Sequence, residues 1–155
     1  MLYFQYLKIK IARLMNNSLV DDKIKELFVS YRTIAIVGVS ADTNKASNRI
    51  MKFLRNTGYK VFPINPHTDN KIINGEKVYN NLEEIEEHVG IVNVFRPNEE
   101  VIEIAKQSIK IGANVFWCQL GIHNESAAKL ISENKIYYIS NKCIKVEYER
   151  LFRKI

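Results

Sequence analysis

The chain has 155 residues, of which 46% are hydrophobic and 26% are charged, a balance typical of one soluble globular domain. The formal net charge of +6 favours anionic partners, but the lysines are scattered and no RNA-binding or zinc-finger signature is present, which argues against nucleic acid. No stretch approaches the roughly 20 consecutive apolar residues of a membrane span. Two distant cysteines, Cys118 and Cys143, give no support to a disulfide framework or a zinc site and indicate a reduced, cytoplasmic protein.

The first 17 residues are apolar and basic, and they predict an N-terminal extension, disordered or helical, ahead of one domain over residues 18–155. A break in regular structure is expected at Asn16-Asn17-Ser18, before this domain. Asp21 and Asp22 then predict the start of a helix, because acidic side chains suit its positive end. Within this helix, the i, i+3, i+4 spacing of Ile24, Leu27 and Phe28 predicts that they share one buried face.

A strand buried on both faces is predicted at Thr33–Val37, where mostly β-branched, apolar residues lead directly into a glycine. Gly38 permits the tight turn and close approach that a side chain would block. After a polar segment, a helical pattern runs from Ser47 to Asn56, with Gly58 at the position of a left-handed C-terminal cap. Strand, glycine turn and helix are the first unit of a nucleotide-binding α/β sheet, with a phosphate seat at the helix start.

The next segment combines a second strand with short, turn-rich elements. Lys60–Ile64 is predicted as the strand, and Asn65-Pro66 ends it. Lys71–Tyr79 contains Asn-Gly between apolar residues and predicts a small hairpin. Asn81 is expected to cap a short acidic helix over Leu82–Glu87.

Strands and helices alternate regularly through the second half of the chain. The predicted strands are Ile91–Phe95, Asn114–Trp117 and Ile136–Ile139, and the predicted helices begin at an Asn98 cap, at Asn124 and at Val146. Because this alternation continues along the whole domain, the sequence predicts an α/β fold, a Rossmann-like, doubly wound parallel sheet of five strands flanked by helices.

Candidate ligand-binding residues follow from this fold. In an open parallel sheet, ligands bind beyond the carboxyl ends of the strands, where the strand order reverses. The residues that directly follow the predicted strands are Gly38, Val39, Ser40, Asn65, Pro66, His67, Arg96, Pro97, Gln119, Leu120 and Gly121. Their turns and polar groups suit a ligand rich in phosphate and amide groups.

Two common nucleotide signatures are incomplete in this sequence. A dinucleotide fingerprint needs three glycines, but the run from Gly38 to Thr43 has only the first. The second strand ends in Asn65-Pro66, with no acidic residue for a ribose hydroxyl, and this weighs against NAD or FAD. A Walker A loop is also absent from the sequence, which weighs against ATP hydrolysis.

Seven short segments together carry a more specific pattern. They are Ile36–Ser40, Ser47–Arg49, Tyr59–Pro66, Gly75–Tyr79, Val94–Pro97, Trp117–Gly121 and Asn141–Lys145. In this order and spacing they resemble the small stand-alone CoA-binding proteins, which are relatives of the CoA-binding domain of succinyl-CoA synthetase. The resemblance covers the chain from about Ile24 to Phe152.

The resemblance implies a Rossmann-like fold that binds coenzyme A or an acyl-CoA. It implies that the Gly38-Val39-Ser40 turn, together with Ser47 and Arg49 at the following helix start, contacts the phosphates. Asn65 and Pro66 would border the adenosine end. The remaining implied cleft residues are Val94, Phe95, Arg96 and Pro97, with Gln119 and Gly121 at the far side. The Arg96-Pro97 pair replaces the two arginines that are more usual there.

The predicted function is therefore a cytoplasmic CoA-binding or acyl-CoA-binding protein without chemistry of its own. No nucleophile–base pair, carboxylate dyad or metal cluster can be identified in the sequence, and the catalytic histidine of the synthetase belongs to a second domain. Two alternatives stay open. One is an NAD(P)-dependent enzyme or redox-sensing nucleotide-binding module, and the other is a structural or partner-binding subunit. Cys143, between Lys142 and Lys145, has a setting that favours a thiolate, whereas Cys118 is expected to be buried and inert.

Overall fold

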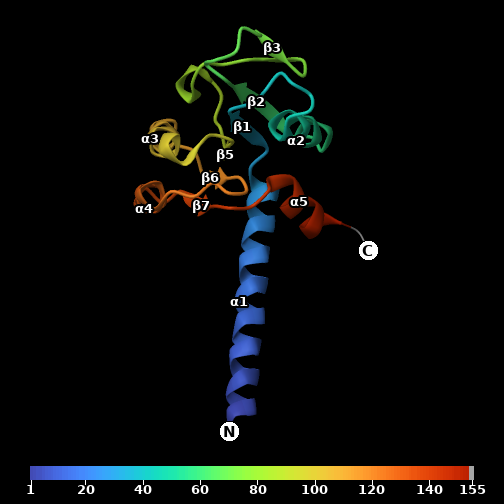
Figure 1. The fold of residues 1–155 in the computed structure, drawn as a ribbon, viewed down its shortest axis with the longest axis vertical. Coiled ribbons are helices and arrows are strands. Elements are labelled where there is room, and N and C mark those ends of the chain that lie inside the picture. The colour runs from blue at the N-terminus through green and yellow to red at the C-terminus, as the bar shows by residue number, and fades with distance from the viewer. Residues whose placement is uncertain (154–155) are drawn as a thin grey trace.

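Five parallel strands form the central sheet of the computed structural model, which describes residues 1–153 (Figure 1). The strands are β1 (Thr33–Val37), β2 (Lys60–Ile64), β5 (Ile91–Val94), β6 (Val115–Cys118) and β7 (Tyr137–Ile139). They lie in the order β2-β1-β5-β6-β7, so the chain winds outward from β1 to one side and then from β5 to the other. This topology confirms the predicted Rossmann-like, doubly wound α/β sheet and places its switch point between β1 and β5.

Helices cover both faces of the sheet. One face packs against α3 (Val101–Lys110) and α4 (Glu125–Glu133), and the other against α2 (Ala46–Asn56), α5 (Ile144–Phe152) and the end of α1 (Leu2–Ser30) (Figure 1). Successive strand residues alternate between two buried clusters, as Val92 and Val94 contribute to the first and Ile91 to the second. The sheet is therefore buried on both sides, which accounts for the apolar runs of its strands.

The N-terminal helix α1 is continuous over 29 residues. The predicted interruption at Asn16–Ser18 and the predicted helix start at Asp21 are therefore wrong, since Asn and Ser cost only a few tenths of a kcal/mol each inside a helix. The predicted buried face is confirmed, because Ile24, Leu27 and Phe28 pack into the domain. Residues 1–20 are all exposed and project away from the sheet as an arm (Figure 1).

Within residues 1–153, no helix is both long and apolar enough to cross a bilayer.

The short elements between β2 and α3 differ from their predicted extents. The hairpin is confirmed as β3 (Ile72–Ile73) and β4 (Glu76–Lys77), joined by Asn74 and Gly75 at φ 49° and 81°. The Asn81 side chain accepts from two backbone N–H groups as predicted, but the helix it caps is only the 3₁₀ turn η1 (Leu82–Glu84). A second 3₁₀ turn, η2 (Asn98–Glu100), precedes α3.

Asn98 does not cap the helix that follows it. Its side-chain oxygen instead accepts a hydrogen bond from the backbone N–H of His123 at 3.0 Å. Asn98 therefore ties the loop after β5 to the loop after β6, and it does so through a contact between distant parts of the chain.

The carboxyl end of the edge strand β2 is paired on its outer side. Pro63 has no N–H, and its carbonyl accepts from the backbone N–H of Tyr79 at 3.0 Å. The next outward-facing N–H, that of Asn65, donates to the Tyr79 carbonyl, also at 3.0 Å. The segment after the hairpin thus covers the carboxyl end of this edge.

Candidate functional site

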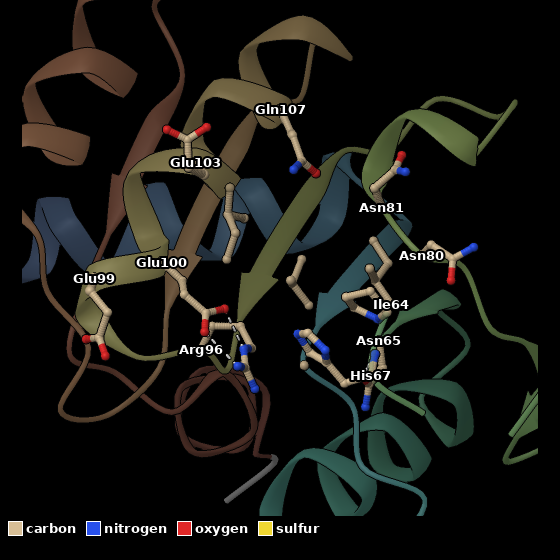
Figure 2. A pocket seen from close by; sticks show the side chains of 14 residues that line it. Ile64, Asn65, His67, Asn80, Asn81, Arg96, Glu99, Glu100, Glu103 and Gln107 are labelled. Atoms are coloured by element: carbon tan, nitrogen blue, oxygen red, sulfur yellow. Dashed lines mark hydrogen bonds and ion pairs between the residues drawn. The ribbon is translucent and has the colours of Figure 1, made fainter. Parts of the chain in front are cut away.

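A cavity of about 260 Å³ lies at the carboxyl ends of β1 and β2, beside α3 (Figure 2). Val37, Ile64 and Ile104 give it apolar walls, and its polar rim comes from three loops and α3. It adjoins the switch point between β1 and β5, the position where doubly wound sheets bind their ligands. The fold therefore places a cavity where the sequence predicts a binding site.

Gly38 closes the turn after β1 in a conformation that only glycine adopts without strain. Its φ is +96°, and a Cβ at this position would lie 2.8 Å from both the Phe95 carbonyl oxygen and the Arg96 Cδ. The loops after β1 and β5 thus touch at Gly38. Because residue 38 has no side chain, the loops on the two sides of the switch point can approach this closely.

Most backbone N–H groups of the β1 turn are used inside the protein. Those of Gly38 and Val39 donate to the Ile64 carbonyl at 2.8 and 3.3 Å, and that of Ser40 donates to the Ser47 hydroxyl at 3.0 Å. Val39 itself is fully buried. The turn therefore shapes the site without offering these three N–H groups to a ligand.

The start of α2 carries two basic residues, Lys45 and Arg49, and no acidic residue in its first turn. Its N-cap residue, Lys45, provides no side-chain cap, so the first N–H groups of the helix stay available to an anion. Arg49 is exposed, and its guanidinium donates to the Asn44 carbonyl. Ser47 and Asn48 are buried and hold the loop, with Asn48 donating to the Ser40 carbonyl at 2.8 Å.

Arg96 and Glu100 form a bidentate ion pair on the cavity wall (Figure 2). The Arg96 Nε donates to Glu100 Oε2 at 2.8 Å, and its Nη2 donates to Oε1 at 2.7 Å. These hydrogen bonds hold the pKa of the Glu100 carboxyl below its usual value and raise the pKa of the Arg96 guanidinium. At neutral pH both groups are charged, and the carboxylate of Glu100 takes two of the hydrogen-bond donors of the Arg96 guanidinium.

Asn65 and His67 face this ion pair from the other side of the cavity (Figure 2), and Pro66 between them also lines it. The Asn65 amide donates to the Val39 carbonyl at 2.9 Å, and its oxygen accepts from the His67 N–H at 2.8 Å. Asn65 therefore fixes the loop after β2 against the turn after β1. His67 is exposed on the rim.

The structure separates the predicted site residues into those at the cavity and those elsewhere. Gly38, Asn65, Pro66 and Arg96 line it. The others lie outside its lining: Val39, Ser40, Ser47, Arg49, Phe95, Pro97, Gln119 and Gly121. Phe95 is half-buried against the opposite face of the sheet, and Pro97 is exposed.

Gln119 points into the protein core. Its Nε2 donates to Asn93 Oδ1 at 2.6 Å, and Asn93 is fully buried on β5. The Asn93 Nδ2 has no hydrogen-bond partner within residues 1–153. Gly121 lies in the exposed loop after β6, where its N–H donates to the Asn141 side chain at 2.8 Å.

Sequence reasoning missed the acidic side of the cavity. Glu99, Glu100 and Glu103 line it, and none of them is among the predicted binding residues. The four-residue spacing between Arg96 and Glu100 was the available signal for their ion pair. Asn93 was missed because it lies within an otherwise apolar strand.

The two cysteines differ in burial. Cys118 is fully buried at the end of β6, and burial raises the pKa of its thiol to about 11, which confirms the expected inert setting. Cys143 is half-buried at the N-cap of α5. In the described part of the chain, no group of three His, Cys, Asp or Glu side chains could hold a metal ion.

Fold and cavity together define a doubly wound α/β domain with a cavity beside its switch point. A family model described as "CoA binding domain" matches residues 32–149, and the chain belongs to this family. The resemblance seen in the sequence is thereby confirmed, and the family supports a CoA-related binding role.

Three relatives illustrate the extent of this similarity. The uncharacterized protein YneT of Bacillus subtilis is 35% identical over 126 residues, which make up 81% of this chain and 92% of that protein. The structure of a hypothetical protein from Pyrococcus horikoshii OT3 is 34% identical, with a TM-score of 0.81, over 84% of this chain and 91% of that one. An ADP-forming acetate–CoA ligase of Methanocaldococcus jannaschii is 31% identical over 86 residues, which are 55% of this chain and only 12% of the ligase.

Proposed function

We propose that the protein is a cytoplasmic, non-catalytic binding protein for coenzyme A or an acyl-CoA. The observation that carries this proposal is the cavity at the switch point, closed by Gly38 and Arg96, in a chain of the CoA binding domain family. The positive start of α2 borders the same turn, so a nucleotide and its phosphates find complementary surfaces next to each other.

The residues present fit such a ligand. Val37, Ile64, Ile104 and Pro66 offer apolar walls to a purine base. The first turn of α2, with Lys45 and Arg49, offers N–H groups and positive charge to a pyrophosphate. A cavity of about 260 Å³ is below the usual range for a drug-sized ligand, so it holds only the adenosine end and the pantetheine arm extends over the surface.

The chemistry of the cavity supports binding without catalysis. Among the described residues that line it there is no serine, threonine, cysteine or lysine, and Glu100, one of its three glutamates, is engaged by Arg96. Cys118, with its thiol pKa raised by burial, lies in the core away from the cavity lining. The bound molecule is therefore held rather than converted in this proposal.

Calorimetric titration with CoA, NADH and ATP tests the proposal. We expect CoA to bind and the other two ligands to bind at least tenfold more weakly. Replacing Arg49 by Gln should weaken CoA binding about tenfold, as expected for one charge-assisted contact. Lys60→Gln removes a charge at the start of β2 and serves as the control, with no change expected. Preferential NADH binding would instead support a nicotinamide-dependent protein, and no binding of any ligand would support a partner-binding subunit.

A further inference from the structure

The wall of the switch-point cavity carries more negative than positive charge. Glu99, Glu100 and Glu103 line it, and Arg96 is the one arginine or lysine among its described lining residues. The Arg96 guanidinium is already neutralised by Glu100 through two hydrogen bonds of 2.7 and 2.8 Å. An entering phosphate would therefore meet carboxylates rather than a free cation, although the site otherwise suits a nucleotide.

Arg96 is held in place by its stem as well as by its charge. Its Cδ packs against the bare Cα of Gly38, where a Cβ would come within 2.8 Å. The guanidinium thus stands over the switch point, with one third of the side chain exposed to solvent. A small rotation about the outer bonds of the side chain would release Glu100 and turn the guanidinium toward the cavity, while the stem stays on Gly38.

We propose that Glu100 competes with the ligand for Arg96, and that this exchange makes Glu100 the residue that sets the affinity for the 3′-phosphate of CoA. The inference rests on the proposed function. In that proposal Pro66 borders the purine base at the adenosine end, and the adjacent Asn65 faces Arg96 across the cavity (Figure 2). The 3′-phosphate on the ribose is then the ligand anion nearest to Arg96, and it takes over the two donors that Glu100 holds in the free protein.

The exchange predicts opposite effects for the two partners. Removing the Glu100 charge frees Arg96 in advance, so CoA should bind more tightly to Glu100→Gln. Removing Arg96 eliminates the donor, so CoA should bind more weakly to Arg96→Gln, and Glu100→Gln should then bring no further gain. Neither partner is deeply buried, so both variants should remain folded, which thermal melting can check.

Calorimetry with CoA and dephospho-CoA, which lacks the 3′-phosphate, tests this inference. Glu100→Gln should tighten CoA about tenfold, the effect of one charge-assisted contact, and dephospho-CoA less than threefold. The matched control is Glu99→Gln, which removes the same charge from the same cavity without a hydrogen bond to Arg96 and should tighten CoA less than threefold.

The outcomes separate this inference from the function on which it rests. Equal tightening in Glu99→Gln and Glu100→Gln would mean a general charge effect and would overturn the exchange. Weaker CoA binding in Glu100→Gln would show that Glu100 positions Arg96 for the ligand, and would overturn it too. If the unaltered protein does not bind CoA, the proposed function itself fails, whereas CoA binding with an unchanged affinity in Glu100→Gln refutes the exchange alone.

Discussion

At residue 38, both the backbone conformation and the packing require a glycine. Ala at this position would adopt a left-handed backbone at a cost of about 1–2 kcal/mol. Its Cβ would also clash with the Phe95 carbonyl, which adds about 1–3 kcal/mol of overpacking. We therefore expect Gly38→Ala to lower the free energy of unfolding by about 3 kcal/mol in urea denaturation.

Gly121 provides the control for this substitution. It also has a positive φ, of +76°, but nothing lies within 4 Å of the position that its Cβ would take. Gly121→Ala should therefore cost only the backbone strain, about 1–2 kcal/mol. Equal losses for the two variants would show that the contact between the loops after β1 and β5 is too loose to restrict residue 38.

The buried amides of Asn93 and Gln119 form a second residue-scale test. Gln119→Leu would leave both polar groups of the fully buried Asn93 without a partner, which should cost about 2 kcal/mol. Replacing both residues by Leu removes the unpaired groups, so the double variant should be more stable than Gln119→Leu alone. Chemical denaturation of Gln119→Leu, Asn93→Leu, the double variant and the parent gives the coupling energy. Simple additivity would mean that water satisfies the Asn93 amide.

At the scale of elements, α5 attaches α1 to the domain through charge as well as apolar packing. Arg150 on α5 donates to both carboxylate oxygens of Asp21 on α1 at 2.7 Å, and to Glu147 at 2.6 Å. Hydrogen bonding to Arg150 lowers the pKa of Asp21 below its usual value of 3.8. The Asp21 side chain is 37% exposed, so solvent screening limits the value of the pair.

The pH dependence of stability measures this contribution. A lowered carboxylate pKa stabilises the folded state above the unfolded pKa, and the effect disappears as pH falls through the folded value. Asp21→Asn should therefore cost roughly 0.5–1 kcal/mol at pH 7 and nothing at about pH 2. Glu26→Gln, which breaks an exposed ion pair with Lys23 on the same helix, should change stability little at either pH. A pH-independent loss in Asp21→Asn would point to packing instead of charge.

The strands were the elements most readily predicted from the sequence. The bounds of β1 and β2 coincide with the prediction, because buried apolar runs end at glycine, asparagine and proline. The continuity of α1 was missed because weak helix formers at residues 16–18 do not stop a helix. The cap role assigned to Asn98 failed because its side chain bonds to His123, a contact set by tertiary structure.

The candidate site was predictable only in part, for a related reason. Placing ligands beyond strand ends identified Gly38, Asn65, Pro66 and Arg96, which do line the cavity. The same rule included Gln119, whose side chain turns inward to Asn93 because the strand register brings the two amides together. Strand order locates the edge where a site forms, whereas side-chain direction depends on packing that a sequence does not display.

At the scale of the whole molecule, α1 divides into an anchored end and an exposed arm. Residues 1–20 are exposed throughout, and the family match begins only at residue 32. Deleting residues 2–14 should therefore leave the urea midpoint unchanged and reduce only the helical signal in circular dichroism. Deleting residues 2–28 removes Ile24, Leu27 and Phe28 from the core and should cost roughly 5 kcal/mol or more. Destabilisation by the shorter deletion would mean that the arm folds back onto the domain.

The covered edge of β2 has a consequence for how newly made copies of this protein meet. An open edge offers N–H and C=O groups on which a strand of a neighbouring chain can assemble, the first step toward cross-β aggregates. Along β2, the ring of Pro63 offers no donor and its carbonyl is already bonded to Tyr79. A neighbouring strand therefore finds these groups of Pro63 and Asn65 already occupied at the carboxyl end of β2, and the opposite edge, β7, is only three residues long.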